Sequence, residues 1–214
     1  NCSSLTKIII PSSVNSIQFT AFKGCKSLKE FIIPPHITII DNLVFESCRS
    51  LTEIIIPPSV TGIGREAFRG CISLTRVIIP ESVTRIQYAA FRECTSLTNI
   101  TLPSSITDIE IEVFDSCSSL KEFVIPPKVS VISYYAFRDC SSLEKITIPS
   151  SVTQILNYAF SYCSSLKQIE IPSSVILIEN CVFKGCSSLM QITLPSSINR
   201  SHLNIPASAK ITLI

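Results

Sequence analysis

The chain has 214 residues, of which 46% are hydrophobic, an ordinary share for a folded globular chain. Its 18 basic and 16 acidic residues are interspersed and leave a net charge of +2, so no basic patch indicates nucleic acid binding. No apolar run approaches the roughly 18 residues that a membrane-spanning helix needs, so we expect no membrane insertion by this segment.

A repeat of 23 residues organises almost the whole chain. The unit that begins at Cys140 follows the pattern C-x-S-L-x-x-I-x-I-P-x-x-V-x-x-I-x-x-x-A-F. A fixed period of roughly 20 to 30 residues is typical of a solenoid, in which each repeat is one coil stacked on the next. We therefore expect one elongated array. The cysteine of the pattern recurs without a gap at Cys2, Cys25, Cys48, Cys71, Cys94, Cys117, Cys140, Cys163 and Cys186.

Each coil is expected to begin with a short parallel strand. Apolar residues alternate with others in this segment, so in the first coil Leu5, Ile8 and Ile10 are expected to point inward. The same alternation places Lys7 and Ile9 on the opposite, open face. Proline follows the segment in every coil, and because proline has no N–H to donate it is expected to end each strand at the same level.

The rest of each coil is expected to turn a corner and return along a back wall. In the first coil Val14 and Ile17 supply the apolar side chains of this wall. The following A-F-x-x-C stretch is expected to form a helical or 3₁₀ turn, with Phe22 filling the centre of the coil. A single coil cannot bury its apolar face alone, so stacked neighbours are expected to make one continuous core.

The repeat pattern ends near residue 198. Ser201 stands where an inward isoleucine is expected, and neither Ala nor Phe follows it. We expect residues 1–198 to form a nine-coil array and residues 199–214 to form an irregular C-terminal cap. The chain opens at Asn1-Cys2 without an initiator methionine or an apolar leader, which predicts a fragment of a longer protein whose N-terminal cap is missing.

The pattern L-x-x-I-x-I-P followed by A-F-x-x-C-x-S-L resembles the BspA-like class of leucine-rich repeat, over about residues 1–198. The resemblance implies a right-handed leucine-rich-repeat solenoid, strand-dominated within the α/β repeat class, with a parallel sheet on its concave face. Short strands and 3₁₀ turns are then expected on the convex side. The family has no shared catalytic residues, so the resemblance implies a non-enzymatic surface or secreted protein that binds host or extracellular proteins.

Ten cysteines raise the alternatives of disulfides or a metal site. Nine of them occupy one column, where parallel side chains keep the Cβ atoms near 5 Å apart instead of the roughly 3.8 Å of a disulfide. We expect buried structural thiols. Cys181 lies outside this column and is the thiol expected to be exposed; Cys181 and Cys186 are too far apart in sequence for the usual zinc pairs, so we expect no metal and no cofactor.

Catalytic groups are sparse. The two histidines, His36 and His202, lie near opposite ends of the array, so no Ser/His/Asp constellation is expected. Asp115 shares a column with Arg92 and Arg138, which predicts an ion-pair ladder of small energetic value at an exposed surface. An acidic cluster in the fifth coil is expected to be a solvated back face, not a catalytic carboxylate pair, and it contains Asp108, Glu110, Glu112 and Asp115.

The open face of the sheet is the candidate binding surface. In the first four coils an isoleucine column is bordered by a charged column, whereas later coils present mostly Thr and Gln. An apolar patch rimmed by polar groups commonly marks an interaction surface, although isoleucine also suits a half-buried strand. The candidate residues are Ile9, Ile32, Ile55, Ile78, Glu30, Glu53, Arg76 and Val124.

The expected function is therefore a protein-binding or adhesion scaffold at the cell surface or in secreted form. Two alternatives stay open. Unpaired thiols are normal in reducing compartments, which favours an intracellular, cytoplasmic interaction scaffold. The array is also compatible with a passive spacer or a stalk whose coil ends associate with one another.

Overall fold

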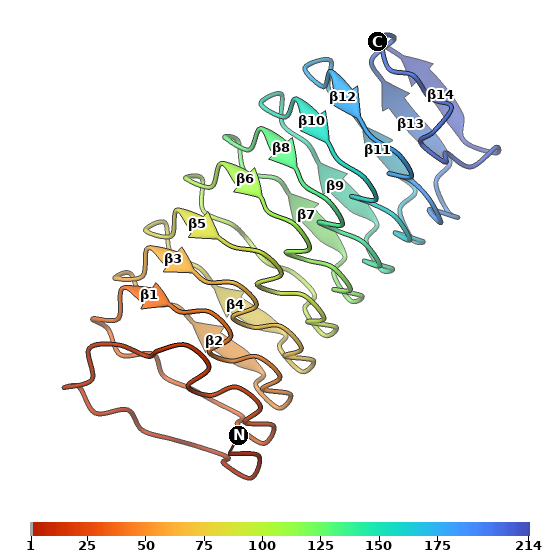
Figure 1. Cartoon of the computed structure of the whole chain (residues 1–214). Coiled ribbons are helices and arrows are strands. Elements are labelled where there is room, and N and C mark those ends of the chain that lie inside the picture. The colour runs from red at the N-terminus through yellow and green to blue at the C-terminus, as the bar shows by residue number, and fades with distance from the viewer. Residues whose placement is uncertain (1) are drawn as a thin grey trace.

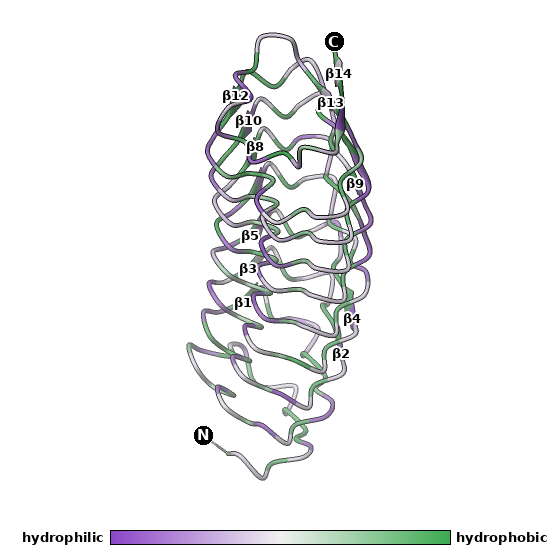
Figure 2. Cartoon of the chain, turned by 90° about the vertical axis from the view of Figure 1, so that its right-hand side faces the viewer, coloured by the Kyte–Doolittle hydropathy of each residue, from purple (hydrophilic) through white to green (hydrophobic). Residues whose placement is uncertain are grey.

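The computed structural model describes residues 2–214, which form an elongated stack of coils (Figure 1). The N-terminus and the C-terminus lie at opposite ends of the stack, and apolar and polar residues alternate around every coil (Figure 2). The described residues contain no α-helix and no 3₁₀ helix. Within these residues there is accordingly no helix that is long and apolar enough to cross a membrane. The predicted solenoid of parallel strands is confirmed.

One side of the solenoid carries the longer strands and is called the long-strand face below. The strands pair in parallel, as β2–β4, β7–β9 and β11–β13–β14. In each strand of three residues the middle residue is buried and the last is exposed, which is the predicted alternation. The strands are β2 (Glu53–Ile55), β4 (Arg76–Ile78), β7 (Glu122–Val124), β9 (Lys145–Thr147), β11 (Gln168–Glu170), β13 (Gln191–Leu194) and β14 (Lys210–Leu213).

The opposite side is a wall of two-residue strands, the short strands predicted for the convex side. They pair in parallel in the orders β1–β3–β5 and β6–β8–β10–β12. Ile40 pairs with Ile63, and Ile63 pairs with Ile86, so the register advances by one sequence repeat per coil. The strands are β1 (Ile39–Ile40), β3 (Gly62–Ile63), β5 (Arg85–Ile86), β6 (Asp108–Ile109), β8 (Val131–Ile132), β10 (Gln154–Ile155) and β12 (Leu177–Ile178).

A column of phenylalanine rings runs through the core from Phe22 to Phe183. Consecutive rings are nearly parallel, and their centroids are 5.4–6.2 Å apart. This spacing lies within the range of offset-stacked aromatic pairs. Each ring contacts the ring of the coil before and the coil after, so the column ties the stack together along its length.

The stretch between the short strand and the cysteine differs from the prediction. It is a run of β-turns, not a helical or 3₁₀ turn, because two residues per coil adopt a positive φ. In the coil around Phe68, the N–H groups of Glu66, Phe68 and Gly70 donate to carbonyls of the next coil at 2.8–2.9 Å. A positive φ at Glu66 and Gly70, the third residues of turns that start at Gly64 and Phe68, directs these amides along the stack.

The C-terminal segment is more regular than its sequence suggests. Residues 199–209 form turns and bends, but β14 joins the long-strand face in parallel register with β13. Gln191 pairs with Lys210, nineteen positions on, whereas Gln168 pairs with Gln191, twenty-three positions on. The last coil is therefore four residues shorter than the others, and Leu203 supplies a fully buried side chain within it. The capping role of residues 199–214 stays a prediction.

Replacing a central ring should test the phenylalanine column. Phe91 is fully buried between Phe68 and Phe114, so Phe91→Ala should lower the free energy of unfolding by about 3–5 kcal/mol. Phe22 lies in the first coil and is not fully buried, so Phe22→Ala should cost clearly less. Urea unfolding followed by circular dichroism measures both. Equal losses in the two variants would contradict a core whose stability depends on neighbours on both sides.

Candidate functional site

The predicted isoleucine column lies on the long-strand face with its side chains in solvent. The exposed fractions of Ile9, Ile32, Ile55 and Ile78 are 82%, 82%, 56% and 37%. Ile55 and Ile78 are direct partners in the β2–β4 ladder, and the flanking residues of each strand point into the core. Ile9 and Ile32 occupy the equivalent positions of the first two coils, where the expected strand is not formed. These four side chains, called the isoleucine stripe below, follow one another coil by coil along the axis of the stack.

The charged residues beside the stripe neutralise one another. Lys7 Nζ lies 2.6 Å from Glu30 Oε1, and Arg76 Nη1 lies 2.7 Å from Glu53 Oε1. Each pair joins adjacent coils and is well exposed, so each contributes at most about 1 kcal/mol. Because every charge of the rim has its partner within the rim, the surface next to the stripe leaves no charge to be matched by a ligand.

A shallow depression of about 190 Å³ lies at the N-terminal end of the stripe. Ile9 and Ile32 line it, together with the ion pair of Lys7 and Glu30 and the ring of Pro35. An apolar cavity of about 150 Å³ in another protein holds a benzene ring. The depression therefore has room for one large apolar side chain.

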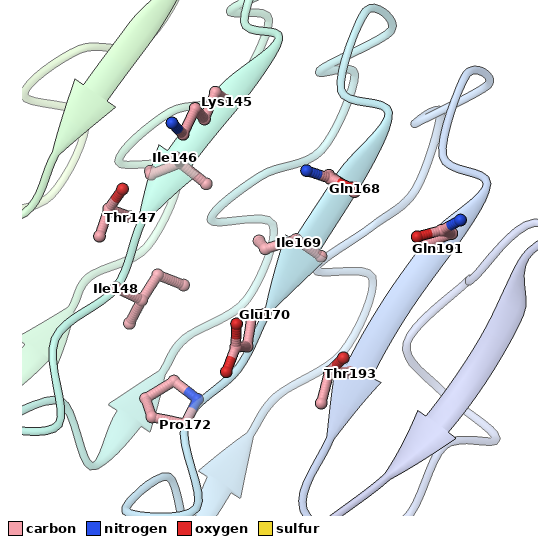
Figure 3. Close-up of a pocket in the computed structure, with 10 residues that line it drawn as sticks. All are labelled: Lys145, Ile146, Thr147, Ile148, Gln168, Ile169, Glu170, Pro172, Gln191 and Thr193. Atoms are coloured by element: carbon pink, nitrogen blue, oxygen red, sulfur yellow. The ribbon is translucent and has the colours of Figure 1, made fainter.

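The C-terminal half of the same face has a different character. Val124 is 67% exposed and isolated, because Thr147 follows it in the next coil. Beyond it lies a depression of about 380 Å³ in which polar side chains of β9, β11 and β13 project from the face (Figure 3). Glu170 lies in its middle, next to Thr193 of the paired strand. Its lining residues are Lys145, Ile146, Thr147, Ile148, Gln168, Ile169, Glu170, Pro172, Gln191 and Thr193.

The cysteine column is buried from Cys25 to Cys186, as predicted, but its first member, Cys2, is exposed, and all ten cysteines are free. From Cys48 onward each column thiol donates a hydrogen bond to the phenylalanine carbonyl of the preceding coil, for example from Cys48 Sγ to Phe22 O at 3.2 Å. Burial raises the pKa of Cys48 and of Cys186 to about 12, so these thiols stay protonated at neutral pH. The expectation that Cys181 is the exposed thiol was wrong: Cys181 is half-buried, and the exposed thiol is Cys2, in the first coil, which has no preceding coil in the described residues to cover it.

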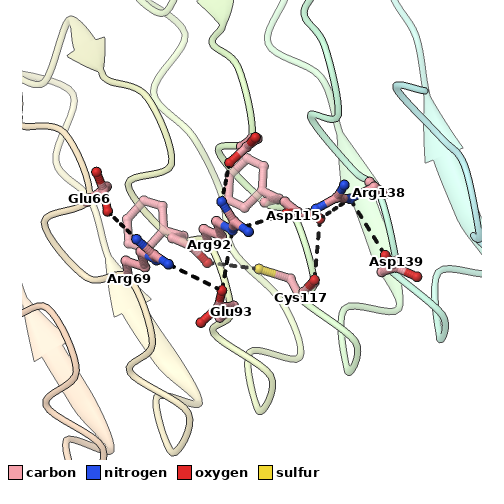
Figure 4. Close-up of polar contacts among 12 residues, drawn as sticks. Glu66, Arg69, Arg92, Glu93, Asp115, Cys117, Arg138 and Asp139 are labelled. Atoms are coloured by element: carbon pink, nitrogen blue, oxygen red, sulfur yellow. Dashed lines mark hydrogen bonds and ion pairs between the residues drawn. The ribbon is translucent and has the colours of Figure 1, made fainter. Parts of the chain in front are cut away.

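An ion-pair cluster occupies the turns of the central coils (Figure 4). Arg138 forms two hydrogen bonds with Asp115, of 2.9 Å from Nε and 2.7 Å from Nη2. On the other side Arg92 Nε lies 3.2 Å from Asp115 Oδ2, and Arg92 Nη1 donates to Glu112 at 2.5 Å. The cluster continues through Glu93 to the neighbouring coil, where Arg69 pairs with Glu66.

The expectation of an exposed ladder was wrong at its centre. Asp115 is fully buried, and the side chain of Glu112 is largely so. The hydrogen bonds to Asp115 are the main cause of the raised pKa of Arg138. Burial raises the pKa of Asp139 at the edge of the cluster, against the opposing effect of Arg138. The expectation of a solvated acidic face holds only for Asp108, which is exposed, because Glu110, Glu112 and Asp115 each pair with an arginine.

Both histidine side chains form hydrogen bonds with backbone carbonyl groups. Their Nε2 atoms donate to carbonyls of the preceding coil, from His36 to Val14 O at 2.5 Å and from His202 to Ile178 O at 2.9 Å. Within residues 2–214, no group of three or more His, Cys, Asp or Glu side chains is arranged to hold a metal ion.

Removing the buried carboxylate should destabilise the chain more than removing an exposed one. Asp115→Asn leaves two arginines without their shared counter-ion, which should cost about 3 kcal/mol of unfolding free energy. Glu144 forms an exposed pair with Lys167 at 3.2 Å, so Glu144→Gln should cost less than about 1 kcal/mol. Denaturant titration of both variants measures these changes in the free energy of unfolding. A loss of less than about 1 kcal/mol in Asp115→Asn would mean that the cluster is solvated.

Thiol alkylation should distinguish the eight buried cysteines from the two accessible ones. At pH 8 the folded protein should react at Cys2 and Cys181, while the eight buried thiols stay unmodified because the fold shields them from the reagent. Mass spectrometry should show two adducts in buffer and ten in denaturant. Cys181→Ser should reduce the native count to one. Rapid native labelling beyond two sites would show that the coils open.

Comparison with known proteins agrees with this geometry. The sequence profile of the "BspA type Leucine rich repeat region" matches residues 1–121 and 107–210, in six copies. Among solved structures, a leucine-rich repeat protein from Bacteroides ovatus is 31% identical with a TM-score of 0.86, over 99% of this chain and 52% of that protein. The chain thus spans about half the length of that relative.

Two further structures share the fold. The leucine-rich repeat protein of T. pallidum is 30% identical with a TM-score of 0.67, over 82% of this chain and 78% of that one. A leucine-rich repeat protein from Eubacterium ventriosum is 18% identical with a TM-score of 0.62, over 90% and 79%, and shows the fold alone. No protein with a curated description matches the sequence. The leucine-rich repeat fold is typically a non-enzymatic protein-interaction scaffold, and by its repeats this chain belongs to the BspA-type leucine-rich repeat family.

Proposed function

We propose that the chain is an adhesion module that binds extracellular or host proteins through the long-strand face, as part of a cell-surface or secreted protein. The observation that carries this proposal is the isoleucine stripe, which places four large apolar side chains side by side in solvent. Contiguous exposed apolar patches with a polar rim are typical of interaction sites.

The fold itself does not require isoleucine at these positions. The same outward position is occupied by Thr147, Glu170 and Thr193 in later coils, where the strands pair in the same way. Strand propensity alone therefore explains the stripe poorly, since threonine serves the same backbone. The four isoleucines are a local choice of the first coils, which supports a role in contact with a partner.

The free thiols favour a second candidate, an interaction scaffold in a reducing compartment. Ten unpaired cysteines are unusual in oxidising surroundings, although the eight buried ones are protected by the fold. The same face would then bind an intracellular protein. Labelling of the protein on intact source cells with a membrane-impermeant reagent separates the two locations, because only a surface protein reacts.

Polar substitution of the stripe should abolish binding without unfolding the chain. Ile32→Ser, Ile55→Ser and Ile78→Ser together remove the apolar contact area, so adhesion to immobilised extracellular-matrix proteins should fall at least tenfold. The side chains are solvent-exposed, so the far-ultraviolet circular dichroism spectrum should stay unchanged.

A matched control replaces exposed isoleucines elsewhere. Ile39 and Ile176 are also solvent-exposed but lie on the short-strand side of the coils, so Ile39→Ser with Ile176→Ser should leave adhesion intact. Full adhesion by the folded stripe variant, or an equal loss in the control variant, would remove the stripe from the binding site.

A further inference from the structure

We propose that the partner of the isoleucine stripe is an amphipathic α-helix that lies along the axis of the stack. This inference rests on the proposed function, since it names the kind of protein segment that the long-strand face binds. Its apolar residues at i, i+4, i+7 and i+11 would contact Ile9, Ile32, Ile55 and Ile78 in turn.

The spacing of the stripe favours a helix over an extended segment. Ile55 and Ile78 are partners in a parallel ladder, in which strands lie about 4.8 Å apart. Ile9 and Ile32 occupy the same position of the two preceding coils, so at this spacing the four isoleucines span about 14 Å. Eleven residues of helix rise about 16 Å, which differs by less than the width of a side chain. An extended strand places same-face residues about 6.6 Å apart, so four of them span about 20 Å and lose register.

The location of the stripe also argues against strand addition. An added strand pairs with the backbone at a sheet edge, whereas the stripe lies on the face of the β2–β4 ladder. A ligand on this face meets side chains only. A helix satisfies its own backbone hydrogen bonds and presents only side chains, so it brings no unpaired amide to the apolar surface.

The charges on the rim define the polarity of the partner. The pairs of Lys7 with Glu30 and of Glu53 with Arg76 are closed within the rim, so the helix needs no net charge of its own. A second copy packed antiparallel, stripe on stripe, would place Glu30 opposite Glu53 and Lys7 opposite Arg76. Like charges would then face each other, which disfavours such a dimer.

The depression at the N-terminal end supplies an anchor point. A leucine or phenylalanine at one end of the helix would enter the space between Ile9, Ile32 and Pro35. Buried apolar anchors that fill a pocket carry much of the energy of protein interfaces. The remaining three contacts set the direction of the helix along the stack.

Two synthetic peptides of the same composition test the proposal. One 15-residue peptide has phenylalanine at i, opposite the depression beside Ile9, and leucine at i+4, i+7 and i+11. It has a neutral polar face and a hydrocarbon staple that fixes the helix. The other has the same residues, but its apolar residues stand at every second position, as they would on one face of an extended strand. Fluorescence anisotropy should show micromolar binding of the helical peptide and at least tenfold weaker binding of the alternating one. Raising salt from 50 to 500 mM should change the Kd less than twofold, because the rim charges are paired internally.

The substitution variants locate the binding. Ile32→Ser with Ile55→Ser and Ile78→Ser should raise the Kd of the helical peptide at least tenfold, whereas Ile39→Ser with Ile176→Ser should leave it unchanged. Equal affinity for both peptides, or binding that survives loss of the stripe, would overturn the helix. A dimer in sedimentation that the stripe substitutions abolish would also overturn it, because the second copy would then be the occupant.

The outcome is separable from that of the adhesion assay. Loss of adhesion in the stripe variant without binding of the helical peptide would keep the proposed function and reject the helix. Stripe-dependent binding of the helical peptide with unchanged adhesion would support the helix and reject the adhesion role.

Discussion

The structure depends on the stacking of each coil on its neighbours. A single coil is too thin to bury its own phenylalanine or leucine, so the core exists only between coils, and the ring of Phe91 is covered from above and below. Backbone hydrogen bonds run in the same direction, from strand to strand and from turn to turn. Apolar packing and backbone pairing thus both require that equivalent residues of neighbouring coils lie 23 positions apart in the sequence. A residue inserted into one coil would disturb both at once.

This constraint explains which features were predictable from sequence. A side chain that points inward meets its own equivalent in the next coil, so columns such as that of Phe91 repeat and can be read directly from the sequence. The exposed position of Ile55 follows from the alternation along each strand, and the burial of the thiols from Cys25 to Cys186 follows from their repeating column. The short strands of the opposite side were implied by the resemblance to leucine-rich repeats. These are features in which one coil predicts the next.

Features that vary from coil to coil were not predictable in the same way. Leu43 and Tyr135 adopt a positive φ although glycine is the usual residue there, because coil-to-coil hydrogen bonds hold the turn. Asp115 is a charged residue that would be expected at the surface. It is buried because arginines of the two neighbouring coils, Arg92 and Arg138, pair with its carboxylate. Strand β14 joins the sheet after a coil shortened by four residues, which no column pattern indicates. In each case the decisive partner lies in another coil and is not part of the repeat.

The long-strand face combines both kinds of information. Its backbone is held by the stack, so the outward side chains are free to vary without cost to the fold, and Ile78 gives way to Thr101 while the inward residues stay apolar. Such a surface is rigid before it meets a ligand, so little conformational entropy is lost on binding. Because the surface is rigid, a ligand can contact every isoleucine only if its own apolar side chains are spaced about 4.8 Å apart, like the coils. A ligand with another spacing would leave some isoleucines in water. In the proposed complex the partner is therefore selected by its own periodicity as much as by its hydrophobicity, and the α-helix is the regular segment whose repeat lies nearest to that of the coils.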